Sequence, residues 1–156
     1  MKIKFWGVRG SIPTPHTHNH IKDKIKRALS LATPKDIISE NAIESFIASL
    51  PFSLKGTYGG NSTCVEIQTD GGDLIIIDGG TGIKNLGIEL MKGDFGKARG
   101  IGNMLFTHTH WDHIQGIPFF LPFYVVVNRF NIYSPFDDIR DRIEYEQVFS
   151  HFPLNL

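Results

Sequence analysis

The sequence predicts an α/β domain. Some segments alternate apolar and polar residues or are apolar throughout, as strands are, whereas other segments repeat apolar residues at helical spacing. A chain of 156 residues fits one domain with one core. We therefore expect a single mixed α/β domain over residues 1–156, with a helical insertion at residues 16–56 between its first two strands.

The strand segments are bounded by turn residues. The first strand ends where the Gly and Pro residues of "RGSIPTP" begin. The segment "TDGGD" predicts a β-hairpin, because glycine readily adopts the positive φ of a tight turn. The segment "LIIID" after it is apolar on both faces, which predicts a sheet that is covered on both sides. The expected strands are residues 2–8, 62–69, 73–78, 101–107 and 125–134.

Helices are expected within the insertion, at residues 82–91 and at residues 138–150. In the insertion, Thr33 and Pro34 predict the capped start of a second helix, with Asp36 near its positive end and Pro51 marking its close. The positions that repeat at helical spacing are Ile21, Ile25, Ala28, Leu29 and Ala32 in the first helix and Ile43, Phe46, Ile47 and Leu50 in the second.

Composition excludes several classes of protein. The 16 basic residues balance the 16 acidic ones, so no overall field draws the chain toward nucleic acid or an anionic membrane. The single cysteine, Cys64, excludes a disulfide framework, and its place in an alternating run predicts a small core residue. No secretory signal precedes the first strand, and the apolar run 117–127 is too short and too broken by proline to span a bilayer. We expect a cytoplasmic protein without a membrane segment.

A cluster of metal-binding residue types follows the fourth strand. In "HTHWDH", side chains alternate along an extended segment, so His108, His110 and Asp112 can point one way, and a helical turn can bring His113 beside them. Imidazole and carboxylate suit zinc, with manganese or iron as alternatives. A solvated loop is the other interpretation, but four such groups in an apolar region are hard to desolvate without a metal. They can serve one ion or be shared by two.

A second group of histidines is interpreted differently. The segment "HTHNH", residues 16–20, lies in a polar stretch with no apolar surround. We interpret it as a solvated loop that holds metal only adventitiously.

The same motif carries a resemblance. "HTHWDH" matches the H-x-H-x-D-H motif of the metallo-β-lactamase-fold hydrolases, and "FWGVRGSIPTP", "YGGNSTCVEI" and "LIIIDGGTG" agree with that family in order. Within the family the chain looks most like the phosphodiesterase and tRNA 3′-end-processing branch. The resemblance covers residues 1–15 and 58–156 and implies a metallo-β-lactamase-like αββα sandwich.

The resemblance also implies a site and a reaction. His108 and His110 would bind the first of two divalent ions, Asp112 and His113 the second, and Asp78 would brace the ligand loop. A hydroxide bridging the two ions would attack a small-molecule or nucleotide phosphodiester in line, with Asp112 accepting or relaying a proton. A nucleic-acid substrate is compatible with this chemistry but is not indicated by the balanced charge.

The chain departs from the family pattern after residue 113. The remaining ligands of the family come from the second half of the sandwich, and His151, in "FSHFPLNL", does not resemble one of them. We therefore expect the amino-terminal half of the domain, which exposes an apolar sheet face and forms a homo-oligomer or binds a complementing chain. As a monomer it would hold metal weakly and catalyse little. The alternatives are a catalytically silent metal-binding or scaffolding half-domain and, third, a thioesterase or lactamase-like hydrolase.

Overall fold

The computed structural model describes residues 1–148, which fall into two units. The first unit contains Met1–Thr14 and the residues from Gly60 onward, and the second contains Pro15–Gly59. That the second unit is an insertion into one domain stays a prediction. His151 and residues 149–150 of the predicted closing helix lie outside the described residues.

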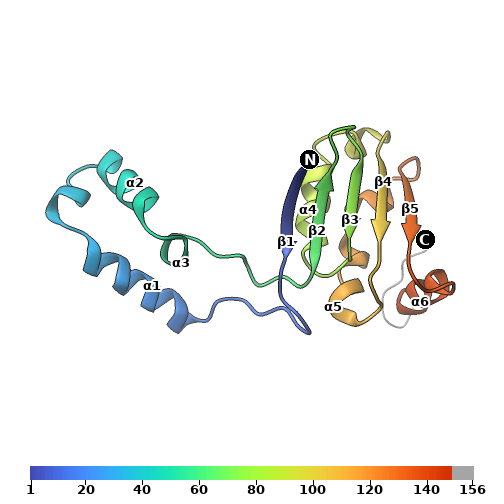
Figure 1. The fold of residues 1–156 in the computed structure, drawn as a ribbon, viewed down its shortest axis with the longest axis horizontal. Helices are drawn as coiled ribbons and strands as arrows, with labels where there is room; N and C mark the ends of the chain where they lie inside the picture. Colours follow the sequence, from blue (N-terminus) through green and yellow to red (C-terminus); the bar gives the residue numbers. More distant parts are fainter. Residues whose placement is uncertain (149–156) are drawn as a thin grey trace. The chain divides into compact units, whose positions relative to one another are not determined.

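The first unit is built on a five-stranded sheet whose strand order follows the chain (Figure 1). The first three strands are antiparallel neighbours, of which the second and third are joined by the predicted hairpin, and the last three are parallel. The strands are β1 (Lys2–Gly7), β2 (Cys64–Gln68), β3 (Leu74–Ile77), β4 (Ile101–Leu105) and β5 (Arg129–Tyr133). The predicted α/β class and its five strands are confirmed.

Local hydrogen bonds fix the ends of these strands. In the hairpin the amide of Thr69 donates to the carbonyl of Asp73 at 3.0 Å, and of the two turn glycines only Gly72 has a positive φ, 91°. β5 begins four residues later than predicted, because Asn128 belongs to the preceding turn. Its side-chain amide donates to the carbonyls of Phe95 and Pro122.

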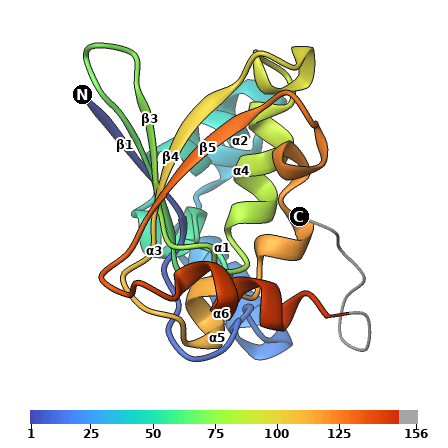
Figure 2. The same cartoon turned by 90° about the vertical axis from the view of Figure 1, so that its right-hand side faces the viewer.

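Helices cover one face of the sheet (Figure 2). These are α4 (Ile83–Leu90), α5 (Trp111–Ile114) and α6 (Ile139–Glu146), with 3₁₀ turns η2 (Phe95–Lys97), η3 (Ile117–Phe119) and η4 (Leu121–Tyr124). The turns were not predicted from the sequence. Among the described residues no helix combines the length and the apolar character needed to cross a membrane. The core between sheet and helices contains Cys64, Leu74, Ile76, Ile83, Leu86, Phe95, Met104, Phe106, Ile114, Ile117, Phe120 and Ile143.

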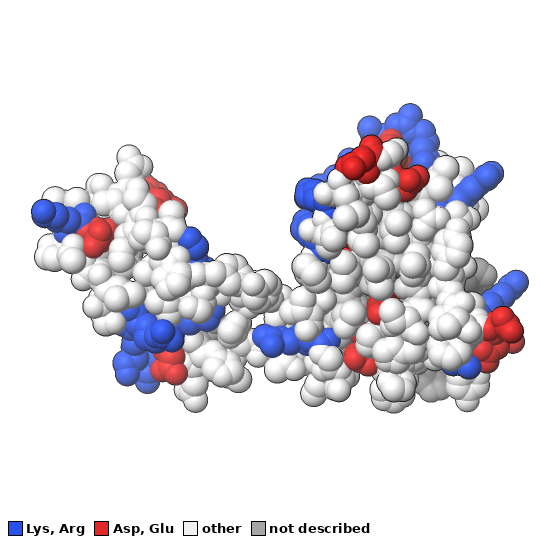
Figure 3. Space-filling view, in the orientation of Figure 1, with Lys and Arg blue, Asp and Glu red and all other residues white. Residues whose placement is uncertain are grey.

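The opposite face of the sheet carries rows of mostly apolar residues that no helix in the described part of the first unit covers. Side chains along a strand alternate between the two faces of the sheet. Ile76 and Met104 are paired with each other and buried, so their side chains face the helices. The residues next to them along each strand therefore face away from the helices. This outer face is nearly without charged side chains (Figure 3). Its two rows are Phe5, Val65, Ile77, Leu105 and Tyr133, and Ile3, Ile67, Ile75, Asn103 and Asn131. The expected cover on both sides is thus present on one side only within residues 1–148.

The second unit contains the two expected helices, but their boundaries differ from the prediction. They are α1 (His18–Leu31) and α2 (Glu40–Ser49), with a 3₁₀ turn η1 (Pro34–Ile37) between them and a short α3 (Phe52–Lys55) after them. Thr33 and Asp36 do not open the second helix. The Asp36 carboxylate accepts hydrogen bonds from the amide and the hydroxyl of Thr33 and so caps η1. These hydrogen bonds lower the pKa of Asp36.

Hydroxyl caps explain both corrected boundaries. Ser39 accepts from the amide of Ala42 at 3.2 Å and so begins α2. The segment "HTHNH" is likewise not a loop, because Thr17 accepts from the amide of His20 and places His18 and His20 in the first turn of α1. A capping box, with His20 reaching back to the Thr17 amide, was not anticipated.

The difference between the two sheet faces predicts unequal costs of truncation. Ile76 is fully buried, so Ile76→Ala is expected to lower the free energy of unfolding by about 2–5 kcal/mol. Its neighbour Ile75 faces away from the helices and is only half-buried, so Ile75→Ala should cost clearly less. Urea titration of both variants measures the difference. Equal costs would show that the outer face is also covered in solution.

Candidate metal centre

Four loop segments meet at one end of the sheet, where β1, β3 and β4 end and β2 begins (Figure 1). The amide of Ser11, in the loop after β1, donates to Asp112 Oδ2 at 2.8 Å. Ser62 and Thr81 exchange hydrogen bonds of 2.9 Å, each from a backbone amide to the other hydroxyl, and Gln115 donates to Ser62 Oγ at 3.1 Å. The segments that carry the resemblance are therefore held together.

Asp78 lies at the centre of these contacts. It follows β3 directly, adopts a positive φ of 60° and is 2% exposed. Its Oδ1 accepts from the amide of Thr107 at 2.8 Å, and its Oδ2 lies 2.7 Å from His113 Nδ1. The Thr107 hydroxyl lies within 3.0 Å of both carboxylate oxygens. This buried carboxylate joins the end of β3 to the end of β4 and to α5.

The loop after β4 turns into a helix sooner than the sequence suggested. His110 is the extended residue before α5, and Asp112 and His113 both lie in the first turn of that helix. Asp112 is thus not on the extended segment that carries His108 and His110. The helical turn nevertheless brings donor atoms of His108, Asp112 and His113 within 4.8 Å of one another. His113 Nε2 lies 3.3 Å from Asp112 Oδ2.

His110 lies beside this group but outside it. Its ring packs edge-on against the ring of His108, with the centroids 4.6 Å apart, and its side chain is exposed. The rings of His108 and His113 lie closer, at 3.9 Å. Three of the four predicted ligands therefore converge, and the ligand role of all four stays a prediction.

The surroundings of Asp112 favour its ionised form. Burial raises the pKa of this carboxyl, but the hydrogen bond from the Ser11 amide and the neighbouring His113 and His108 together outweigh burial. The pKa of Asp112 therefore lies below its ordinary value. Ser11 makes this contact with a positive φ of 64°, a backbone conformation that sequence patterns do not reveal for serine.

Glycines allow α5 to lie directly on the loop after β3. The amide of Gly116 donates to the carbonyl of Gly79 at 2.9 Å, and the amide of Gly79 donates to the carbonyl of His113 at 2.6 Å. A Cβ on Gly116 would lie 2.1 Å from the carbonyl oxygen of Gly80. Gly116 therefore has no room for a side chain at this contact.

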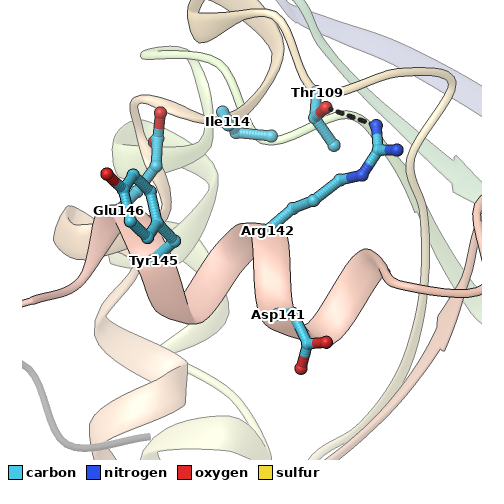
Figure 4. A pocket seen from close by; sticks show the side chains of 6 residues that line it. All are labelled: Thr109, Ile114, Asp141, Arg142, Tyr145 and Glu146. Carbon is cyan, nitrogen blue, oxygen red and sulfur yellow. Dashed lines mark hydrogen bonds between the residues drawn. The ribbon is translucent and has the colours of Figure 1, made fainter.

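An open pocket of about 370 Å³ lies on the α6 side of the motif (Figure 4). Arg142 donates to Thr109 Oγ1 at 3.2 Å and to Asp138 Oδ1 at 2.8 Å, so it ties the residue between His108 and His110 to α6. The lining residues are Thr109, Ile114, Asp141, Arg142, Tyr145 and Glu146. Neither Arg142 nor Ser11 was predicted, since each acts through a contact distant in sequence.

The apolar residues after the motif take two different positions. Ile117, Phe120 and Pro122 are buried under the helical layer, where they form core and not the wall of a cleft. Trp111, within the motif, is 76% exposed, so its side chain points into solvent.

The donor set fits a divalent cation. Two imidazoles and a carboxylate suit zinc, and the second ring nitrogen of His113 meets a carboxylate, as it does in many metal sites. Three donors leave further coordination positions open.

Comparison with known proteins agrees with this class of site. The family model of the metallo-beta-lactamase superfamily matches residues 57–129, which include Asp78 and the whole motif. No curated protein and no solved structure matches the chain. The mixed α/β sheet and its helices are consistent with part of a metallo-β-lactamase fold. At this level the match supports a metal-dependent hydrolase, and the phosphodiesterase and tRNA 3′-processing branch stays a prediction.

The contacts of Asp78 predict its effect on metal binding. Asp78→Ala removes the acceptor of Thr107 and His113, so zinc affinity should fall about 10–100-fold. Competition with a chromophoric chelator measures the affinity. Asp23→Ala, which removes an exposed carboxylate from the second unit, serves as the matched control and should change nothing. Unchanged affinity in Asp78→Ala would contradict the role assigned to this carboxylate.

Proposed function

We propose that the chain takes part in metal-dependent hydrolysis of phosphodiester bonds. The observation that carries this proposal is the convergence of His108, Asp112 and His113 at the end of the sheet. The family match supports the hydrolase class, and the ordered motifs in the sequence favour the phosphodiester branch.

Each residue has a separate part in this proposal. His108, His110, Asp112 and His113 are the proposed ligands of two divalent cations, most simply zinc, with manganese or iron as alternatives. The ions, when bound, would supply Lewis acidity and a nucleophile at neutral pH. Asp78 fixes His113 with Nδ1 toward its carboxylate, which leaves Nε2 to face Asp112. The Ser11 amide keeps Asp112 ionised, as a ligand or proton acceptor requires.

The proposal includes association. Two ions need more donors than the three that converge, and the outer sheet face is rich in exposed apolar residues, among them Phe5 and Tyr133 at 62% and 52%. A homo-oligomer or a complementing chain would cover this face and bring further ligands. The cytoplasm stays the predicted location of the chain.

A silent metal-binding or scaffolding half-domain is the second candidate. It is favoured by the position of His110, which lies outside the three-donor group. Three donors can hold one ion with open coordination positions, but they do not form a dinuclear centre. A thioesterase or lactamase-like activity would use the same donors on a different substrate.

Metal content and turnover together distinguish the candidates. For the phosphodiesterase we expect two ions per chain by elemental analysis and zinc-dependent hydrolysis of bis(p-nitrophenyl) phosphate. Asp112→Ala should lower turnover about 100-fold or more, because it removes both a ligand and the proton acceptor. Chelation followed by addition of zinc should abolish and restore the activity.

Other results would select another candidate. Less than one ion per chain without turnover would support the silent half-domain. Faster turnover of a thioester or a β-lactam than of the phosphodiester would move the assignment within the hydrolase class. Asp23→Ala is again the control, since its exposed carboxylate lies in the second unit.

A further inference from the structure

The helices of the second unit carry apolar side chains that the unit itself leaves uncovered. On α1, Ile21, Ile25 and Leu29 follow one another at four-residue intervals, and they are 46%, 54% and 65% exposed. Residues at this spacing lie on one face of a helix. On α2, Ile43 and Ile47 form a shorter stripe, 39% and 43% exposed.

The unit has little core of its own. Leu50 and Leu54 are its only buried apolar side chains. α1 packs mainly on α3, and α2 packs mainly on η1, so α1 and α2 share few contacts with each other. Two amphipathic helices with open faces gain stability when another helix covers them.

The charged residues beside the apolar stripes indicate which helix would cover each of them. α1 carries four Lys or Arg side chains and one Asp, whereas α2 carries two Glu and no basic residue. Basic side chains gather over α1 in Figure 3. Lys22 and Lys26 directly follow Ile21 and Ile25, and Glu44 directly follows Ile43, with Glu40 one turn earlier. The stripe on α1 is thus flanked by a pair of basic residues, and the stripe on α2 by a pair of acidic residues.

We propose that this unit is a self-association surface and that its partner is a second copy of the chain. In a two-fold arrangement, α1 of each copy packs against α2 of the other, so the same contact forms twice. The stripe of Ile21, Ile25 and Leu29 is buried against Ile43 and Ile47 of the partner copy. Lys22 and Lys26 then lie beside its Glu40 and Glu44, which sets both the partner and the register.

Charge reversal on the full chain tests the proposal. One variant carries Lys22→Glu and Lys26→Glu, and a second carries Glu40→Lys and Glu44→Lys. Each variant alone places like charges across both contacts, so its dimer Kd at low ionic strength should rise about tenfold or more. In an equimolar mixture both contacts regain opposite charges, so a heterodimer should form with a Kd near that of the unmodified chain. Sedimentation velocity with one variant fluorescently labelled measures each Kd.

The mixture separates this proposal from its alternatives. Self-association that persists in both single variants would overturn it, and would point to the sheet face instead. A monomeric unmodified chain would overturn it too, since α1 and α2 would then be closed within one chain or exposed. Loss of association without recovery in the mixture would likewise contradict it, provided that circular dichroism shows unchanged helix content. Lys2→Glu with Lys97→Glu makes the same charge change on the first unit and should leave the Kd unchanged.

Discussion

The arrangement of the candidate site depends on one buried carboxylate. Asp78 reaches Thr107 at the end of β4 and His113 in α5 from the end of β3. These contacts add to the backbone hydrogen bonds between Gly79, His113 and Gly116, and they hold the Nδ1 side of the His113 ring. A carboxylate that is 2% exposed is strongly destabilising unless it is hydrogen-bonded, so the surrounding loops can only settle in arrangements that satisfy it. Precise placement of the donors follows from that requirement.

The two faces of the sheet differ in what covers them. The helical face forms a packed core of aliphatic and aromatic side chains, whereas the outer face has rows of similar residues with no helix over them. The site lies at one end of the sheet, in the loops that follow β1, β3 and β4. A half-covered sheet can therefore hold its donors in place through α4, α5 and the backbone contacts of Gly79 and Gly116.

Sequence patterns predicted the parts that depend on local spacing. Strand-like segments predicted the five strands, the Gly-Gly turn predicted the hairpin, and the H-x-H-x-D-H spacing indicated the segment in which three candidate donors converge. Contacts between distant segments were not predictable in this way. The Ser11 amide reaches Asp112 across 101 residues and the Arg142 side chain reaches Thr109 across 33, and neither pair leaves a periodic signal.

Competition between neighbouring caps explains the errors in the second unit. Thr33, Ser39 and Thr17 are all good caps, and the sequence does not say which of them begins a long helix. Asp36 decided the first case, because its carboxylate bonds back to Thr33 and closes a short turn. The outward position of Trp111 was equally hidden, since an aromatic residue in a polar motif just before an apolar run is compatible with core or surface.

The strand order has a consequence for synthesis on the ribosome. Every strand pairs with the one made just before it, so the sheet can grow by one edge as the chain emerges, and no strand must be threaded between two others. Strand β1 is the exception, because all of Pro15–Gly59 must be translated before its partner β2 is made. The hydrogen bonds of Asp78 also form late, because Thr107 and His113 are translated 29 and 35 residues after it. The donors are therefore translated after β4 and before β5, the last strand of the sheet.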